Sequence, residues 1–197
     1  MTPSAPIPQV EEHPLSPFLP PAARLLMLGS FPPPRYRWSM DFYYPNWNND
    51  MWRIVGRVFF QDKDYFADVS QKRFRREQLV EFLQRTGIAL YDTASAVRRL
   101  QANASDKYLE VIRPTDVPAL LRSLPLCRAL VTTGEKATDT LCQTFGIEAP
   151  GVGDFVEFLW EGRVLRLYRM PSSSRAYPLS LEKKAAAYRR MFQEIFG

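Results

Sequence analysis

The stretch "LLMLGSFPPPRYRWSMDFYYPNWNNDMW", residues 25–52, decides how this chain folds. It opens as a short apolar run that ends at Gly29, as expected of a central β-strand. Three prolines, two arginines and a dense mixture of aromatic and amide side chains then follow. Such a mixture is costly to bury and awkward to expose. In open α/β sheets ligands bind beyond the carboxyl ends of the strands, so this loop is predicted to line a site.

The rest of the chain alternates strands and helices in the same way. Apolar runs predict strands at 24–28, 88–92 and 128–134, and Glu161-Gly162 is a hairpin signal. Helical spacing and capping residues predict helices at 49–60, 72–87, 115–123, 135–146 and 181–196. This alternation predicts a layered α/β fold with a mainly parallel sheet. The loops that leave the strands are expected at 29–50, 92–108 and 170–180.

Length and composition indicate one domain. The chain has 197 residues, 46% hydrophobic and 24% charged, ordinary for a soluble globular protein. Seven prolines within residues 1–21 exclude a helix there and predict an extended arm, laid on the domain or partly mobile. We therefore expect a Pro-rich arm at 1–21 and a single domain at 22–197.

Several classes of protein are disfavoured by what the sequence lacks. It has no run of eighteen apolar residues, no signal-peptide pattern and only two cysteines. No GxxxxGK[ST] or GxGxxG phosphate loop occurs. The one histidine, His13, lies in the arm, so we expect no histidine near the site and neither a Ser-His-Asp hydrolase nor a His-based metal centre.

What remains is a site of aromatic rings, amides and a few carboxylates. Aromatic faces stack on a planar heterocycle and amides read its polar edge, so the pattern suits a site that binds and turns over such a molecule. A net charge of +5 favours an anionic partner, although only weakly.

Four motifs then resemble a known family. "GSFPPP" (29–34), "FYYPNWNNDMW" (42–52), "GIALYDTAS" (87–95) and "MPSSSRAYP" (170–178) are similar to motifs of the uracil-DNA glycosylase superfamily, and most of all to its hypoxanthine/uracil branch. The resemblance covers roughly residues 12–196. It implies a three-layer αβα sandwich around a four-stranded, mainly parallel sheet. It also implies hydrolysis of the N-glycosidic bond of a deaminated base flipped from DNA, without a cofactor.

The resemblance also suggests roles for single residues. Asn49 aligns with the branch's catalytic Asn, Asp92 with the residue that reads the base edge, and Phe42 or Tyr43 with the ring that stacks on the base. Phe31 and Met170 stand where other members carry a water-orienting Asp or Asn and a His. The predicted base-binding residues are Gly29, Ser30, Phe31, Phe42, Tyr43 and Asp92. The predicted DNA-binding residues are Arg35, Arg37, Pro171, Ser172, Ser173, Ser174 and Arg175.

Structural explanations stay open for the same residues. Asn49 could cap the helix that follows it, Asp92 could cap the segment 93–100, and the serines at 172–174 could cap the last helix. The basic clusters at 72–76 and 183–184 are typical of solvated helix faces.

At the level of the whole protein, we expect a monomeric, cytoplasmic and nucleoid-associated DNA repair glycosylase. Its partner would be DNA that contains uracil or hypoxanthine, and it would need neither a metal nor a membrane. The alternatives are a catalytically weak or inactive DNA- or nucleobase-binding protein of the same fold, or a small protein-interaction domain whose Pro-rich arm docks a partner.

Overall fold

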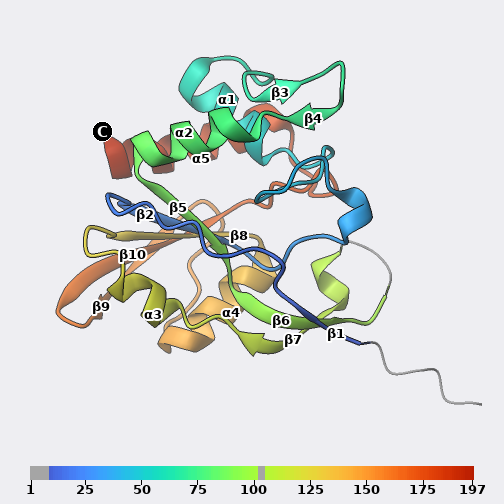
Figure 1. Cartoon of the computed structure of the whole chain (residues 1–197). Coiled ribbons are helices and arrows are strands. Elements are labelled where there is room, and N and C mark those ends of the chain that lie inside the picture. Colours follow the sequence, from blue (N-terminus) through green and yellow to red (C-terminus); the bar gives the residue numbers. More distant parts are fainter. Residues whose placement is uncertain (1–8, 102–104) are drawn as a thin grey trace, which may run out of the picture.

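The computed structural model describes residues 9–101 and 105–197 and has a five-stranded sheet at its centre (Figure 1). In sheet order the strands are β5 (Ile88–Asp92), β2 (Leu25–Gly29), β8 (Ala129–Thr133), β10 (Arg163–Met170) and β9 (Phe155–Trp160). The first four are parallel, and β9 runs antiparallel to β10. The predicted fold class is confirmed, with five strands in place of four because the hairpin at Glu161-Gly162 adds an edge strand.

Helices cover both faces of this sheet. Figure 1 shows α1 (Met51–Phe60), α2 (Arg76–Thr86) and α5 (Leu181–Phe196) on one side, and α3 (Val117–Arg122) and α4 (Glu135–Phe145) on the other. Gly87 and Gly146 end α2 and α4 in the left-handed conformation that glycine adopts without strain. Ser180 caps α5 by accepting a hydrogen bond from the Lys183 N–H. The serines at 172–174 therefore do not cap this helix.

A second, three-stranded antiparallel sheet lies beside the first. It contains β1 (Val10–Glu12), β6 (Ala94–Arg99) and β7 (Leu109–Pro114), in the order β1-β6-β7. Two observations in this region bear on the predictions. Residues 94–99 form a strand, so Asp92 does not cap a helix at 93–100. The described part of the Pro-rich arm, residues 9–21, lies on the domain, and Phe18 exchanges backbone hydrogen bonds with Leu90. Residues 1–8 lie outside the described part.

Three short elements complete the chain. The strands β3 (Ala67–Asp68) and β4 (Arg73–Phe74) pair with each other, which is why α2 begins at residue 76 rather than 72. The 3-10 helices η1 (Arg35–Arg37) and η2 (Asp106–Tyr108) lie in the loops that follow β2 and β6. No helix in the described part of the chain is both long and apolar enough to cross a membrane.

The core explains why one edge of the sheet can hold polar groups. Every residue of β2, β5 and β8 is buried, so the layers on both faces are held by apolar contact. At their carboxyl ends the strands change from apolar residues to small or polar ones, since they end at Gly29, Asp92 and Thr133. Because the strands are parallel, these ends meet at one edge, and the loops that leave them enclose a cavity.

Candidate nucleobase site at the strand ends

The cavity has a volume of about 750 Å³, within the usual range of small-molecule and cofactor sites. Eleven of the predicted site residues line it: Gly29, Ser30, Phe31, Arg37, Tyr43, Asn49, Asp92, Ser172, Ser173, Ser174 and Arg175. They come from three loops that are far apart in sequence. Pro32, Pro33, Tyr44, Pro45, Asn46, Asn48, Ser105, Asp106, Lys107, Thr133, Ala176, Tyr177 and Pro178 complete the lining.

Three predicted residues do not line the cavity. Phe42 is 5% exposed and belongs to the hydrophobic core, where its ring stacks on that of Trp52 with centroids 6.4 Å apart. Pro171 is buried and accepts a hydrogen bond from the Tyr188 hydroxyl. Arg35 forms an exposed ion pair with Asp41 and stacks on Trp38. Of the two rings aligned with the stacking position, only Tyr43 faces the cavity.

The histidine was expected away from the site, and this expectation is wrong. The side chain of His13 is 2% exposed, and its Nε2 lies 2.9 Å from Oδ2 of Asp92. Its ring packs against Tyr91, with centroids 4.5 Å apart, and meets the edge of Phe31 at 5.2 Å. The arm brings it there because β1 pairs with β6, which continues the chain just after Asp92.

Both ring nitrogens of His13 are engaged. Nδ1 lies 3.1 Å from the N–H of Leu15 and 2.9 Å from the carbonyl oxygen of the same residue. When that N–H donates to Nδ1, the imidazole proton sits on Nε2 and is donated to Asp92. The imidazole therefore orients the carboxylate. No ring nitrogen is left to activate a serine, which agrees with the exclusion of a Ser-His-Asp hydrolase.

Gly29 makes room for the second oxygen of Asp92. A Cβ atom at Gly29 would lie 2.5 Å from Oδ1 of Asp92, far closer than real Cβ contacts allow. Any side chain there would displace the carboxylate. Gly29 was predicted to bind the base, but its close neighbour in the structure is the Asp92 carboxylate.

Tyr44 was not singled out from the sequence. Its φ of 49° lies in the left-handed region, which a bulky residue adopts only when its surroundings hold it there. Its hydroxyl lies 3.0 Å from Oγ1 of Thr133, and burial raises its pKa well above the ordinary value for tyrosine. The hydroxyl is therefore neutral and can donate or accept hydrogen bonds at the cavity wall. The signal in the sequence was its place between Tyr43 and Pro45 in an amide-rich loop.

Asn49 lies in the cavity wall and also serves the helix that follows. Its Oδ1 accepts a hydrogen bond from the Met51 N–H at 2.8 Å, which satisfies one donor in the first turn of α1. Its own N–H donates to the Asn46 carbonyl at 2.8 Å. The helix-end contact is therefore present, and the side-chain NH₂ group remains for a ligand.

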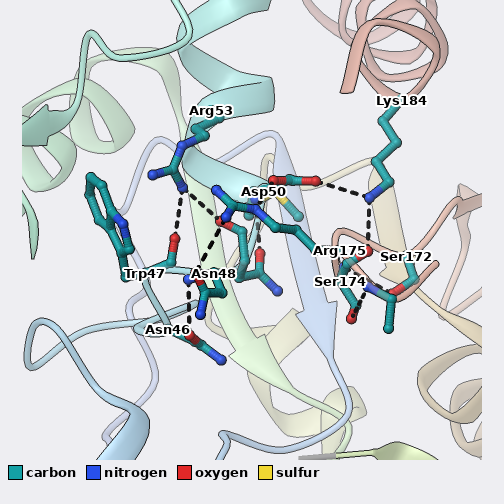
Figure 2. A network of polar contacts seen from close by, with 12 residues as sticks. Asn46, Trp47, Asn48, Asp50, Arg53, Ser172, Ser174, Arg175 and Lys184 are labelled. Carbon is teal, nitrogen blue, oxygen red and sulfur yellow. Dashed lines mark hydrogen bonds and ion pairs between the residues drawn. The ribbon is translucent and has the colours of Figure 1, made fainter. Parts of the chain in front are cut away.

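A buried ion-pair network joins the two loops on either side of Asn49 (Figure 2). Asp50 accepts from Nε of Arg175 at 3.0 Å and from Nζ of Lys184 at 3.1 Å. Lys184 also donates to the carbonyl of Ser174 at 2.8 Å, and Arg175 reaches Asn48 at 3.3 Å. Lys184 is fully buried, so the expectation that residues 183–184 form a solvated helix face is wrong for this residue.

Arg53 fixes the same loop from the side of α1. It is 6% exposed and donates to the carbonyls of Trp47 and Asn49. Its guanidinium also stacks over the Trp47 ring, 4.2 Å from the centroid. The segment 46–50 is thus held by Arg53 on one side and by the ion pairs of Asp50 on the other, and Asn49 lies between these contacts.

A second carboxyl reaches the cavity from η2. Asp106 is partly buried, and this burial raises the pKa of its carboxyl above the ordinary value. Lys107, next to it, is exposed at the rim. The loop was expected to reach the site, but its short "SDKY" segment has no pattern that marks an active residue. In the described ranges, no group of three or more His, Cys, Asp or Glu side chains is placed to hold a metal ion.

Comparison with known proteins gives a likeness of fold. No family model and no curated protein sequence matches this chain. Among solved structures it is similar to a solution NMR structure of a "putative Uracil DNA glycosylase from Methanosarcina acetivorans". The TM-score is 0.59 at 21% sequence identity, over 95% of this chain and 99% of the other. At this identity the likeness shows that the two chains share a fold, and their activities must be argued from the site.

Proposed function

We propose that this protein is a DNA glycosylase. It would bind a deaminated base, uracil or hypoxanthine, flipped from DNA, and hydrolyse the bond between that base and its sugar. The observation that carries the proposal is one cavity lined by aromatic rings, a carboxylate and an amide, with cationic side chains around it. The shared fold with the glycosylase-like structure supports the same reading.

The base would lie against the rings of Phe31 and Tyr43. Oδ2 of Asp92 is occupied by His13, which leaves Oδ1 beside Gly29 to accept a hydrogen bond from an N–H on the base edge. Uracil and hypoxanthine both present such an N–H. Extrusion costs a few kcal/mol and is easier for a mispaired base, which adds selectivity.

Asn49 would place the attacking water. An amide cannot take a proton from water, so its contribution is orientation and stabilisation of the positive charge that develops on the sugar. Such positioning lowers the barrier when the groups are held in place beforehand. Asp50, Arg53 and their partners supply that rigidity from both sides of the loop.

The rim would hold the DNA backbone. Arg37 and Lys107 line the cavity from opposite loops, and the serines at 172–174 add hydroxyl and backbone N–H groups. Such groups position phosphates without reading sequence. Arg175 is engaged by Asp50 and Asn48, so it is a weaker candidate for phosphate contact than the sequence suggested.

The test is release of free base from oligonucleotides with a single deoxyuridine or deoxyinosine, in single and double strands, against undamaged controls. Release from either lesion, with none from the undamaged DNA, supports the proposal. Absence of release from both lesions at protein concentrations that saturate the DNA overturns it.

A second candidate function is binding without hydrolysis. Two apolar residues motivate it: Phe31 stands in the cavity wall, and Met170, 1% exposed, lies in the core at the end of β10. Salt-dependent affinity that is higher for lesion DNA than for intact DNA, with no base released, would select this candidate over the first.

A further inference from the structure

The cavity holds two carboxyl groups whose surroundings differ. Asp92 ends β5 and is hydrogen-bonded by the imidazole of His13. Asp106 opens η2, is partly buried, and has no such partner among its described contacts. Both carboxyls line the same cavity, and so does Tyr44.

Burial and three charged side chains act on Asp106. Burial is the largest influence and favours the neutral carboxyl, and the negative charge of Asp92 acts in the same sense. The Ser30 hydroxyl and the cations Lys136 on α4 and Arg99 on β6 oppose this effect. Arg99 itself forms an ion pair with Glu11 at 3.0 Å and donates a hydrogen bond to the carbonyl of Pro32. These contacts weaken its effect on the cavity. The net effect raises the pKa of Asp106.

Two carboxyls held in such different surroundings within one site commonly take different roles. We propose that Asp106 is the general acid of this site, which protonates the departing base. The site therefore favours a base whose departure is assisted by protonation, namely a deaminated purine, over uracil. This inference rests on the proposed glycosylase function and deepens it.

The chemistry explains the preference for a purine. Hypoxanthine keeps basic ring nitrogens when it is bonded to the sugar, so it can accept a proton as it leaves. Uracil offers only weakly basic carbonyl oxygens and departs as an anion. An acid beside the base therefore lowers the barrier much more for hypoxanthine.

The step balances without a co-reactant beyond water. The electron pair of the bond between C1′ and the base leaves with the base, and the Asp106 proton moves to a base nitrogen. The water oxygen bonds to C1′, its proton passes to solvent, and solvent returns a proton to Asp106. The products are free hypoxanthine and an abasic sugar.

The experiment is single-turnover excision of deoxyinosine and deoxyuridine across a range of pH, with Asp106→Asn and a matched control, Asp139→Asn. Asparagine keeps the size of Asp106 but has no acidic proton. Asp139 is exposed on α4 and does not line the cavity. Asp106→Asn should lose on the order of a hundredfold or more on deoxyinosine, and much less on deoxyuridine.

The pH profile separates acid catalysis from a structural role. The raised pKa keeps Asp106 protonated above the ordinary range of about 4, so wild-type excision of deoxyinosine should fall as the pH rises through that pKa. Asp106→Asn should lack this limb, and Asp139→Asn should keep it. Titration of the ¹³C-labelled Asp106 carboxyl should give the same midpoint.

Three outcomes overturn the inference. In one, Asp106→Asn excises deoxyinosine at the wild-type rate. In another, it loses both substrates equally and keeps the wild-type pH limb, as a purely structural residue would. If the wild-type protein releases neither base, the proposed function fails and the inference falls with it. If the wild type is active and either of the first two outcomes is found, the inference fails alone.

Discussion

Lys184 should carry a large share of the stability of the loops around the cavity. Its side chain is 1% exposed, and Nζ bonds both Asp50 and the carbonyl of Ser174. Lys184→Met keeps the apolar stem but leaves Asp50, 10% exposed, with Arg175 as its remaining cation. Removing one partner of a buried pair costs about 3–5 kcal/mol.

The lower end of that range applies here. The side chain of Arg175 is 47% exposed, so it remains close to Asp50 and water can reach the pair. We therefore expect a loss of about 3 kcal/mol. In a chain of this length that corresponds to a fall of roughly 6–12 °C in Tm.

The assay is urea and thermal unfolding followed by circular dichroism and tryptophan fluorescence. Lys183→Met is the matched control, because the neighbouring lysine is exposed on the same helix, and it should change stability by less than about 0.5 kcal/mol. Adding Asp50→Asn to Lys184→Met removes the unpaired charge. The double variant should be more stable than the sum of the single losses by about 1 kcal/mol.

Equal stability of Lys184→Met and Lys183→Met would refute the reasoning. So would strictly additive losses in the double variant, because the two residues would then not act as a pair. Since the network links Asn46–Asp50 to Ser172–Arg175, a loss of stability should also bring a loss of base excision.

Three further predictions concern the cavity itself. Asn49→Ala should slow excision about a hundredfold at nearly unchanged DNA affinity. It should also lower the free energy of unfolding by about 1 kcal/mol, because the start of α1 loses a hydrogen bond. Excision at the wild-type rate by the folded variant would mean that Asn49 has only the structural role of bonding Met51. Asp92→Asn should shift preference toward uracil, since an amide both donates and accepts, and an unchanged ratio of rates would restrict Asp92 to a structural role. Arg37→Ser should reduce the slope of log affinity against log salt by about one unit, measured by fluorescence anisotropy, and a larger change for Arg175→Ser would place the main phosphate contact at that residue instead.

The residues that follow the strands were predictable from local pattern, and most proved to share one cavity. Parallel strands bring their carboxyl ends to one edge, so Gly29 and Asp92, more than sixty residues apart, meet there. Phe42 was misplaced because two adjacent aromatics in a loop carry no signal for which one turns inward. The structure decides it, since Trp52 and Phe18 pack on Phe42 while Tyr43 faces the cavity.

Local patterns in the sequence predicted the α/β alternation and the positions of the main strands and helices along the chain. The signals behind these predictions are local: apolar runs, glycines at the ends of helices, and the Glu161-Gly162 turn. They can be read from the sequence because the spacing of buried residues and the backbone conformation depend on neighbours in the chain. The pairs His13–Asp92 and Asp50–Lys184 join residues 79 and 134 positions apart, and no local pattern marks them. The side chain of His13 is buried, and Lys184 is buried while Lys183 is not, because of the surfaces that pack against these residues in the folded chain. Only the tertiary structure decided that, and with it the electrostatics of the site.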